Sequence, residues 1–155
     1  MPRFSPTKLL RDAPPDGVHI FRIAKVVEKT SERTGYPLLV MTLETPEFKR
    51  ITSVLTFCEQ AKAVISAVCR SAGLIMPENP DVDVTLEAHH LLSRYIYGVI
   101  VSSAGDLLND PEPRVTRFLT REQAIQKNPA IAQIPLRILP VVTLPVIARE
   151  GKGRQ

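Results

Sequence analysis

The feature that most constrains this chain is one segment of helical periodicity set among segments of strand periodicity. From Glu59 to Ala72 the apolar residues recur at spacings of three and four, with polar residues between them. Gly73 follows, where helices commonly end in a left-handed glycine. The flanking sequence alternates apolar and polar residues as half-buried strands do. The chain is therefore expected to be mainly β, with one principal helix near its middle.

Five strands are expected around that helix. Three precede it and two follow it, at residues 18–29, 37–45, 50–57, 94–102 and 114–119. The first contains a slip in the alternation at Ile20-Phe21, which a β-bulge or a coiled strand would absorb. A short helix is expected within residues 84–92. Thr120 and Gln123 have the capping-box spacing for another, which reaches about Lys127.

This order of elements predicts a five-stranded OB-type β-barrel, whose helix lies between the third and fourth strands. We assign residues 1–16 to an N-terminal lead-in, 17–128 to the barrel domain, and 129–155 to an extended apolar arm with a basic tail. Prolines at positions 135, 140 and 145 forbid a helix or a central strand in the arm. The arm is expected to pack on its own barrel or, through residues 131–148, on another copy in a homo-oligomer.

The charge is unevenly distributed along the chain. Residues 1–50 and 114–155 carry net charges of +3 and +6, whereas residues 51–113 carry −5. If the two basic ends meet on one side of the barrel, they form a face that attracts a polyanion. The chain has no apolar run long enough to span a membrane and no secretory h-region. We therefore expect a cytoplasmic protein, with Cys58 and Cys69 as reduced thiols.

Catalytic and metal-binding patterns are missing from the sequence. It has no nucleophile elbow, P-loop, dinucleotide fingerprint or HExxH motif. Adjacent His89 and His90 do not combine with the two cysteines in any zinc-ligand spacing, and the acidic residues between positions 78 and 87 read as a solvated rim. We predict a protein that is not an enzyme and that uses no metal and no cofactor.

Basic residues are interleaved with aromatic residues on the expected strands and turns. A cationic groove for phosphates combined with flat rings for bases is how proteins hold single strands. Phe48 lies beside Lys49 in the second turn, whereas Phe21, Phe57 and Phe118 are expected in the core. The predicted nucleic-acid-binding residues are Arg22, Lys25, Lys29, Arg33, Tyr36, Lys49, Arg50, Arg94, Tyr95, Tyr97, Arg114 and Arg117.

One family resemblance adds to this interpretation. The run from Ile23 to Leu43, with Lys29-Thr30-Ser31 leading to Gly35-Tyr36-Pro37-Leu38, resembles bacteriophage-encoded OB-type proteins presumed to bind single-stranded DNA. The likeness continues through Leu55-Thr56-Phe57, Ala72-Gly73-Leu74 and Arg114–Leu119, and covers roughly residues 17–125. It implies a role in phage or prophage recombination, replication or repair, in a bacterial host cell, beside a phage recombinase or nuclease. Many such proteins end in an acidic tail, whereas this chain ends Lys152-Gly153-Arg154-Gln155.

Two functions are therefore weighed. The first is sequence-tolerant binding of single-stranded DNA on the barrel. The second is a protein-interaction or oligomeric structural module, in which the barrel is a scaffold and residues 134–148 form the active surface. The sequence does not decide between DNA and RNA as the nucleic acid.

Overall fold

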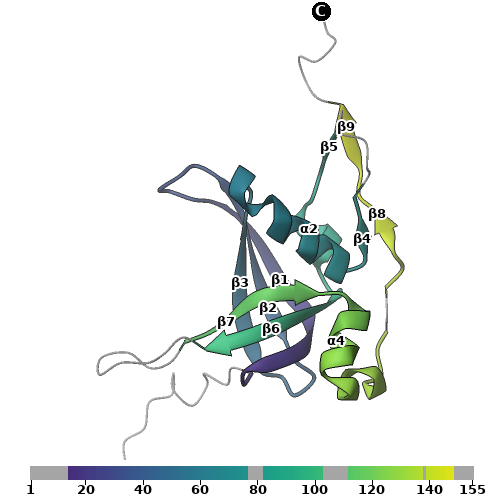
Figure 1. Ribbon diagram of the computed structural model, residues 1–155. Helices are drawn as coiled ribbons and strands as arrows, with labels where there is room; N and C mark the ends of the chain where they lie inside the picture. The colour runs from purple at the N-terminus through teal and green to yellow at the C-terminus, as the bar shows by residue number, and fades with distance from the viewer. Residues whose placement is uncertain (1–13, 77–81, 103–111, 138, 149–155) are drawn as a thin grey trace, which may run out of the picture.

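The computed structural model describes residues 14–76, 82–102, 112–137 and 139–148. Five antiparallel strands form one curled sheet in the order β3-β2-β1-β6-β7 (Figure 1). They are β1 (Gly17–Thr30), β2 (Pro37–Glu44), β3 (Arg50–Thr56), β6 (Tyr95–Ser102) and β7 (Pro113–Leu119). Helix α2 (Lys62–Ser71), preceded by the 3-10 turn η1 (Glu59–Ala61), lies between β3 and β6 in sequence. The mainly β class and the place of the principal helix are thus confirmed.

The main core fills the concave side of the sheet. Helix α2 packs Val68 and Cys69 there, and its C-cap Ala72 follows them. This confirms the C-terminal half of the apolar stripe predicted from the sequence, whereas Val64 is 47% exposed. Gly73 ends the helix with φ of 77°, a conformation that glycine adopts without a Cβ penalty. The strands contribute alternate residues to this core, among them Phe21, Ile23, Leu39, Met41, Leu43, Ile51, Leu55, Ile96 and Ile100.

A second core lies on the convex side of the sheet and explains the slip at Ile20-Phe21. Phe21 belongs to the main core, whereas Ile20 packs with Tyr97 and Leu119 in the second one. Because this part of β1 is buried on both faces, two consecutive apolar residues need no bulge. The bulge of β1 lies further along, at Ala24, where the pairing with β2 shifts between Ile23 and Lys25.

The curled sheet forms a half-barrel. Within the described residues no ladder joins β3 to β7, so the closed barrel expected from the sequence is not seen. Side chains of both strands and of α2 meet across this opening. Strand β6 comes close to its neighbours at Gly98, where an added Cβ would lie 2.9 Å from Val115 Cγ1. A glycine at that position therefore permits the tight approach of β7.

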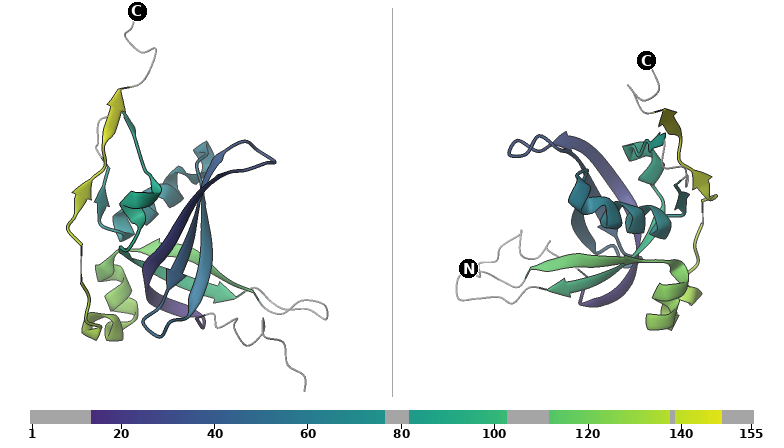
Figure 2. Two further views of the ribbon diagram at one scale, coloured as in Figure 1. Left: turned by 180° about the vertical axis from the view of Figure 1, so that it is seen from behind. Right: turned by 45° about the horizontal axis from the view of Figure 1, so that its top comes forward.

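The second core is covered by the segment that follows β7. Helix α4 (Arg121–Lys127) begins with the predicted capping box, since Thr120 Oγ1 accepts from Gln123 N at 3.2 Å and Gln123 Oε1 accepts from Thr120 N at 3.1 Å. The 3-10 turn η2 (Pro129–Gln133) continues from it and buries Ile131. Figure 2 shows α4 beside one end of the sheet. Only one part of the convex face is covered in this way.

The proline-spaced arm runs back along its own chain. Strand β8 (Val142–Thr143) pairs in parallel with β4 (Leu74–Ile75), and β9 (Val146–Ala148) pairs with β5 (Val82–Val84). Leu144 between them is buried in the main core. The short helix expected within residues 84–92 is α3 (Ala88–Leu91). The arm thus completes the core of the half-barrel.

Several sequence-based expectations lie outside the described residues. They concern most of the lead-in, the loops around residues 77–81 and 103–111, and the basic tail from residue 149. No helix among the described residues is long and apolar enough to cross a bilayer.

Candidate nucleic-acid interface

The convex side of β1, β2 and β3 presents a face that no described helix or strand covers, which we call the outer strand face; residues 134–136 of the arm border it at the end that carries Arg22 and Glu44. The pairing registers place its residues in four rows of three, one residue from each strand. The rows are Arg22-Glu44-Arg50, Lys25-Thr42-Thr52, Val27-Val40-Val54 and Lys29-Leu38-Thr56. The face therefore combines four cations, one carboxylate, a strip of apolar residues and three threonines, one on β2 and two on β3.

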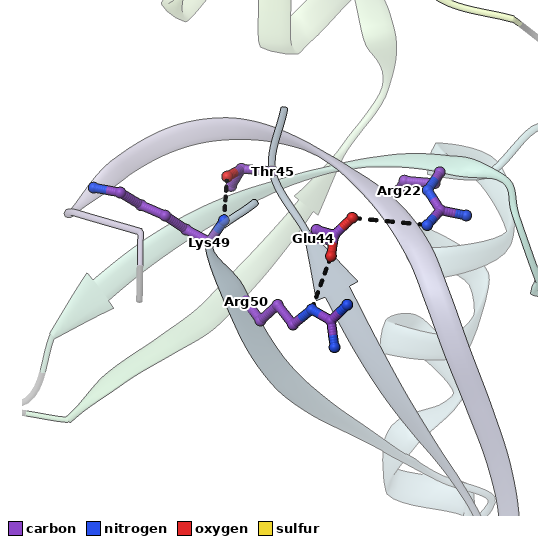
Figure 3. Close-up of polar contacts among 5 residues, drawn as sticks. All are labelled: Arg22, Glu44, Thr45, Lys49 and Arg50. Carbon is purple, nitrogen blue, oxygen red and sulfur yellow. Dashed lines mark hydrogen bonds and ion pairs between the residues drawn. The ribbon is translucent and has the colours of Figure 1, made fainter. Parts of the chain in front are cut away.

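The single carboxylate of this face is held between two arginines (Figure 3). Glu44 Oε2 accepts from Arg50 Nε at 2.8 Å, and Glu44 Oε1 lies 3.7 Å from Arg22 Nη2. The Glu44 side chain is only 10% exposed, whereas the side chain of Arg50 is 65% exposed. One carboxylate between two guanidinium groups leaves a net positive charge at this row. Glu44 also orients Arg50 through its short hydrogen bond, whereas its contact with Arg22 is a longer ion pair.

Lys25 and Lys29 supply the other cations. Both are exposed, and neither has an ion pair among the described residues. The apolar row lies between them, and its Val54 is 52% exposed. Isolated exposed valines are common, but an apolar row bordered by unpaired cations on both sides is unusual for a purely solvated surface.

The hairpin that joins β2 to β3 carries an exposed aromatic ring at one end of this face. Phe48 is 78% exposed and has φ of 67°, in the left-handed region that residues other than glycine and asparagine mostly avoid. The turn is fixed by the bonds Phe48 N to Thr45 O at 2.9 Å and Thr45 N to Lys49 O at 2.8 Å. The sequence placed Phe48 beside Lys49 but gave no sign of its conformation, because a turn of this kind usually takes glycine there.

The opposite end of the face carries the connection between β1 and β2. Arg33 lies exposed in this loop, and Tyr36, 43% exposed, follows Gly35, which has φ of 77°. The Tyr36 carbonyl accepts from Ser31 N at 2.9 Å and closes the loop. Arg33 and Tyr36 therefore lie beyond Lys29, at the end of the same two strands.

The two arginines predicted on β7 are exposed, and the curl of the sheet brings one of them toward β3. Arg117 and Val54 line one cleft of about 370 Å³ between β3, β7 and α2. Arg114 lies nearer the start of β7, and its Nη2 is 3.9 Å from Glu112 Oε2. Arg117 is thus the residue of the predicted β7 pair that comes nearer to the outer strand face.

Two predicted residues lie elsewhere, and a third lies at the border of the face. Arg94 is only 7% exposed and donates to backbone carbonyls, so its side chain does not reach this face. Tyr97 is 4% exposed in the second core, and its hydroxyl accepts from Arg121 Nη1 at 2.9 Å. Tyr95 is half-buried against the same core, but from β6 it pairs with Arg22 and so lies at the edge of the outer strand face. We therefore leave Arg94 and Tyr97 out of the candidate interface and place Tyr95 at its border.

Outside this face, in the described part of the chain, Glu87 lies beside His89, whose Nδ1 is 3.3 Å from Glu87 Oε2. No three histidine, cysteine or acidic side chains gather there in a metal-binding arrangement. Cys58 and Cys69 are free thiols, and burial raises the pKa of Cys69 to about 11. A thiol with so high a pKa is a poor nucleophile at neutral pH.

Comparison with known proteins gives no further guidance. No protein-family model matches the sequence, and no curated protein is significantly similar to it. The function is therefore inferred from the arrangement of the side chains.

Proposed function

We propose that this protein binds single-stranded DNA without strong sequence preference, on the outer strand face. The observation that carries the proposal is the apolar row Val27-Val40-Val54, bordered by Lys25 and Lys29, neither of which has an ion pair within the described part of the chain. Cations attract phosphates, and apolar and aromatic surface receives bases without reading their edges. Phe48 and Tyr36 supply one ring at each end of the face.

The dimensions of the face suit a short stretch of single strand. From Leu38 to Glu44 strand β2 spans about 20 Å at ~3.3 Å per residue. Single-strand binders of the OB type use about 4–16 nucleotides per domain, on the face formed by their second and third strands and the adjoining loops. We further propose that the half-barrel is an OB fold whose third and fifth strands are left unpaired. The order β3-β2-β1-β6-β7, with α2 before β6, supports this assignment.

The biological setting is proposed from the family resemblance. A chain of this kind acts in phage or prophage DNA recombination, replication or repair, beside a recombinase or nuclease that processes the same strand. It holds the strand and does no chemistry on it. The positions of the cations alone do not distinguish DNA from RNA, so the binding test includes both.

The test is fluorescence anisotropy of labelled oligo(dT) and oligo(U) with the full chain over a range of salt concentrations. Removal of one cation that touches a phosphate should reduce the slope of log K against log[salt] by about 0.7. The double variant Lys25→Glu/Lys29→Glu should therefore bind at least tenfold more weakly, with a slope reduced by about 1.4.

The matched control is Lys127→Glu/Arg137→Glu, which makes the same charge change on exposed residues outside the outer strand face. It should keep most of the affinity. Equal reductions in affinity in the two double variants would show that only net charge matters. Absence of binding at low salt would remove the proposal and leave the protein-interaction module as the function to pursue.

A further inference from the structure

A cavity of about 360 Å³ lies where the end of α2, the start of α4 and the arm meet β6. Its charged lining is three arginines, Arg70, Arg94 and Arg121, against the single carboxylate of Glu122. None of the three arginines has a carboxylate within ion-pair distance among the described residues. The cavity therefore carries a net positive charge. Apart from Tyr95, the cross-strand neighbour of Arg22, its lining residues do not belong to the outer strand face.

Arg94 is the unusual member of this group. Its guanidinium is buried, and it donates from Nε to His90 O at 2.9 Å and from Nη1 to Pro140 O at 3.0 Å and Ala72 O at 3.3 Å. These carbonyls belong to α3, the arm and the end of α2, so the side chain joins three segments. All of its partners are neutral, and burial lowers the pKa of Arg94 because its charge is only partly compensated.

One nitrogen of Arg94 remains for a ligand. Within the described residues Nη2 has no acceptor, and no buried side-chain nitrogen or oxygen there lacks a partner. Nη2 is therefore not fully enclosed, and Arg94 is one of the residues that line the cavity. The backbone holds it in this position, because Ser93 has φ of 68° and its N–H donates to Ile23 O at 2.8 Å.

The rest of the lining completes a site for an anion with an apolar body. Arg121 is oriented by its bond to the Tyr97 hydroxyl, and Arg70 is exposed at the rim. Leu139 and Val141 of the arm form an apolar wall, and Tyr95 contributes an aromatic one. Guanidinium groups form paired hydrogen bonds with phosphate oxygens. Three guanidinium groups therefore suit a phosphate dianion better than they suit a ligand with a single carboxylate. A volume of a few hundred Å³ is typical of small-molecule sites.

We propose that this cavity binds the phosphate group of a small phosphorylated molecule of mononucleotide size. Arg94 Nη2, Arg70 and Arg121 hold the phosphate, and the arm and Tyr95 enclose the body of the ligand. The site is independent of DNA binding on the outer strand face. Because the arm forms one wall and Pro140 is bonded to Arg94, ligand binding should also tighten the arm against α2.

The test is calorimetric titration of the full chain with dAMP at constant ionic strength, with adenosine and inorganic phosphate in parallel. We expect dAMP to bind and adenosine to bind far more weakly. Arg70→Glu should weaken dAMP binding about tenfold or more, since it removes charge-assisted bonds to the phosphate. A shift of the Arg94 Nε signal in ¹⁵N spectra on titration would place the phosphate beside Arg94.

The variant Lys25→Glu/Lys29→Glu separates this proposal from DNA binding, since it should leave dAMP binding unchanged. If dAMP does not bind, or if Arg70→Glu binds it as well as the wild-type chain does, the proposal is overturned. It is also overturned if oligo(dT) displaces dAMP competitively, because the phosphate would then come from the DNA strand. Absence of oligo(dT) binding with dAMP binding retained would overturn only the proposed function.

Discussion

Replacement of Phe48 by glycine should stabilise the protein while weakening its hold on single-stranded DNA. Phe48 is strained, with φ of 67°, and its side chain is 78% exposed. A residue kept in such a conformation with so little packing contributes nothing evident to the folded state. Strained residues of this sort gather at binding sites. The two effects of the substitution should therefore have opposite signs.

The magnitudes follow from backbone and surface terms. An L-residue in the left-handed region costs about 1–2 kcal/mol, which glycine avoids. Glycine in turn loses about 0.5–1 kcal/mol more conformational entropy on folding. Because the ring of Phe48 is mostly exposed, its removal forfeits little burial. The net gain is about 0.5–1 kcal/mol, a rise in Tm of about 1–4 °C for a chain of this length.

The effect on binding is larger. A stacked base contributes about 1–3 kcal/mol, so removal of the ring should weaken oligo(dT) binding about 5- to 150-fold. Thermal unfolding and anisotropy on the same preparation measure both effects. The control is Phe48→Ala, which removes the ring but keeps a Cβ in the strained conformation. It should lose the affinity without the gain in stability. A lower Tm for Phe48→Gly, or unchanged binding by both variants, would refute the reasoning.

Three further predictions concern stability. Gly98→Ala places a Cβ 2.9 Å from Val115 Cγ1 and should lower the free energy of unfolding, measured with urea, by about 1–3 kcal/mol. An unchanged urea midpoint would show that β7 can move away from the added Cβ at no cost. Thr120→Ala removes the capping box of α4 and should cost about 0.5–2 kcal/mol, with Thr120→Ser restoring most of it. His90 has a pKa lowered mainly by burial and next by His89, and its Nδ1 accepts from Glu87 N at 2.9 Å. The stabilisation of the folded state by neutral His90 is complete above the unfolded pKa of about 6.5 and is lost as the pH falls through the lower folded pKa. The urea midpoint should therefore fall on acidification. It should fall less in the variant His90→Asn.

The sequence predicted the elements well wherever one face of an element is buried. The stripe from Val68 to Ala72 and the alternation along β2 have clear periods because each element has one apolar side. The same reasoning led to the prediction of a bulge or coiled strand at Ile20-Phe21, where the structure shows burial on both faces instead. Burial on both faces produces two adjacent apolar residues, which is also the pattern of a bulge. The unshifted pairing of β1 with β6 and the tertiary contacts of the second core separate the two interpretations.

The candidate site was harder to predict than the strands. A charged residue on a strand is usually exposed, so Arg94 looked like Lys25 in the sequence. Its burial depends on carbonyls contributed by three distant segments, among them Pro140. Tyr97 was misjudged for a related reason, since Arg121 satisfies its hydroxyl inside the second core. The exposed ring of Phe48 depends on a turn conformation that its sequence does not indicate.

The two parts of the convex side of the sheet are covered differently, and this difference is the main support for a nucleic-acid ligand. Near Ile20 and Tyr97 the face is apolar, and α4 and η2 cover it. Further along β1, no described helix covers the apolar row that contains Val27, and Lys25 and Lys29 lie on either side of it. A face needed only for solubility would carry polar residues in that row, and a face needed only for packing would be covered as its neighbour is. An uncovered apolar strip with cations at its borders fits a ligand that is itself apolar in its bases and anionic in its backbone, as a single strand of nucleic acid is.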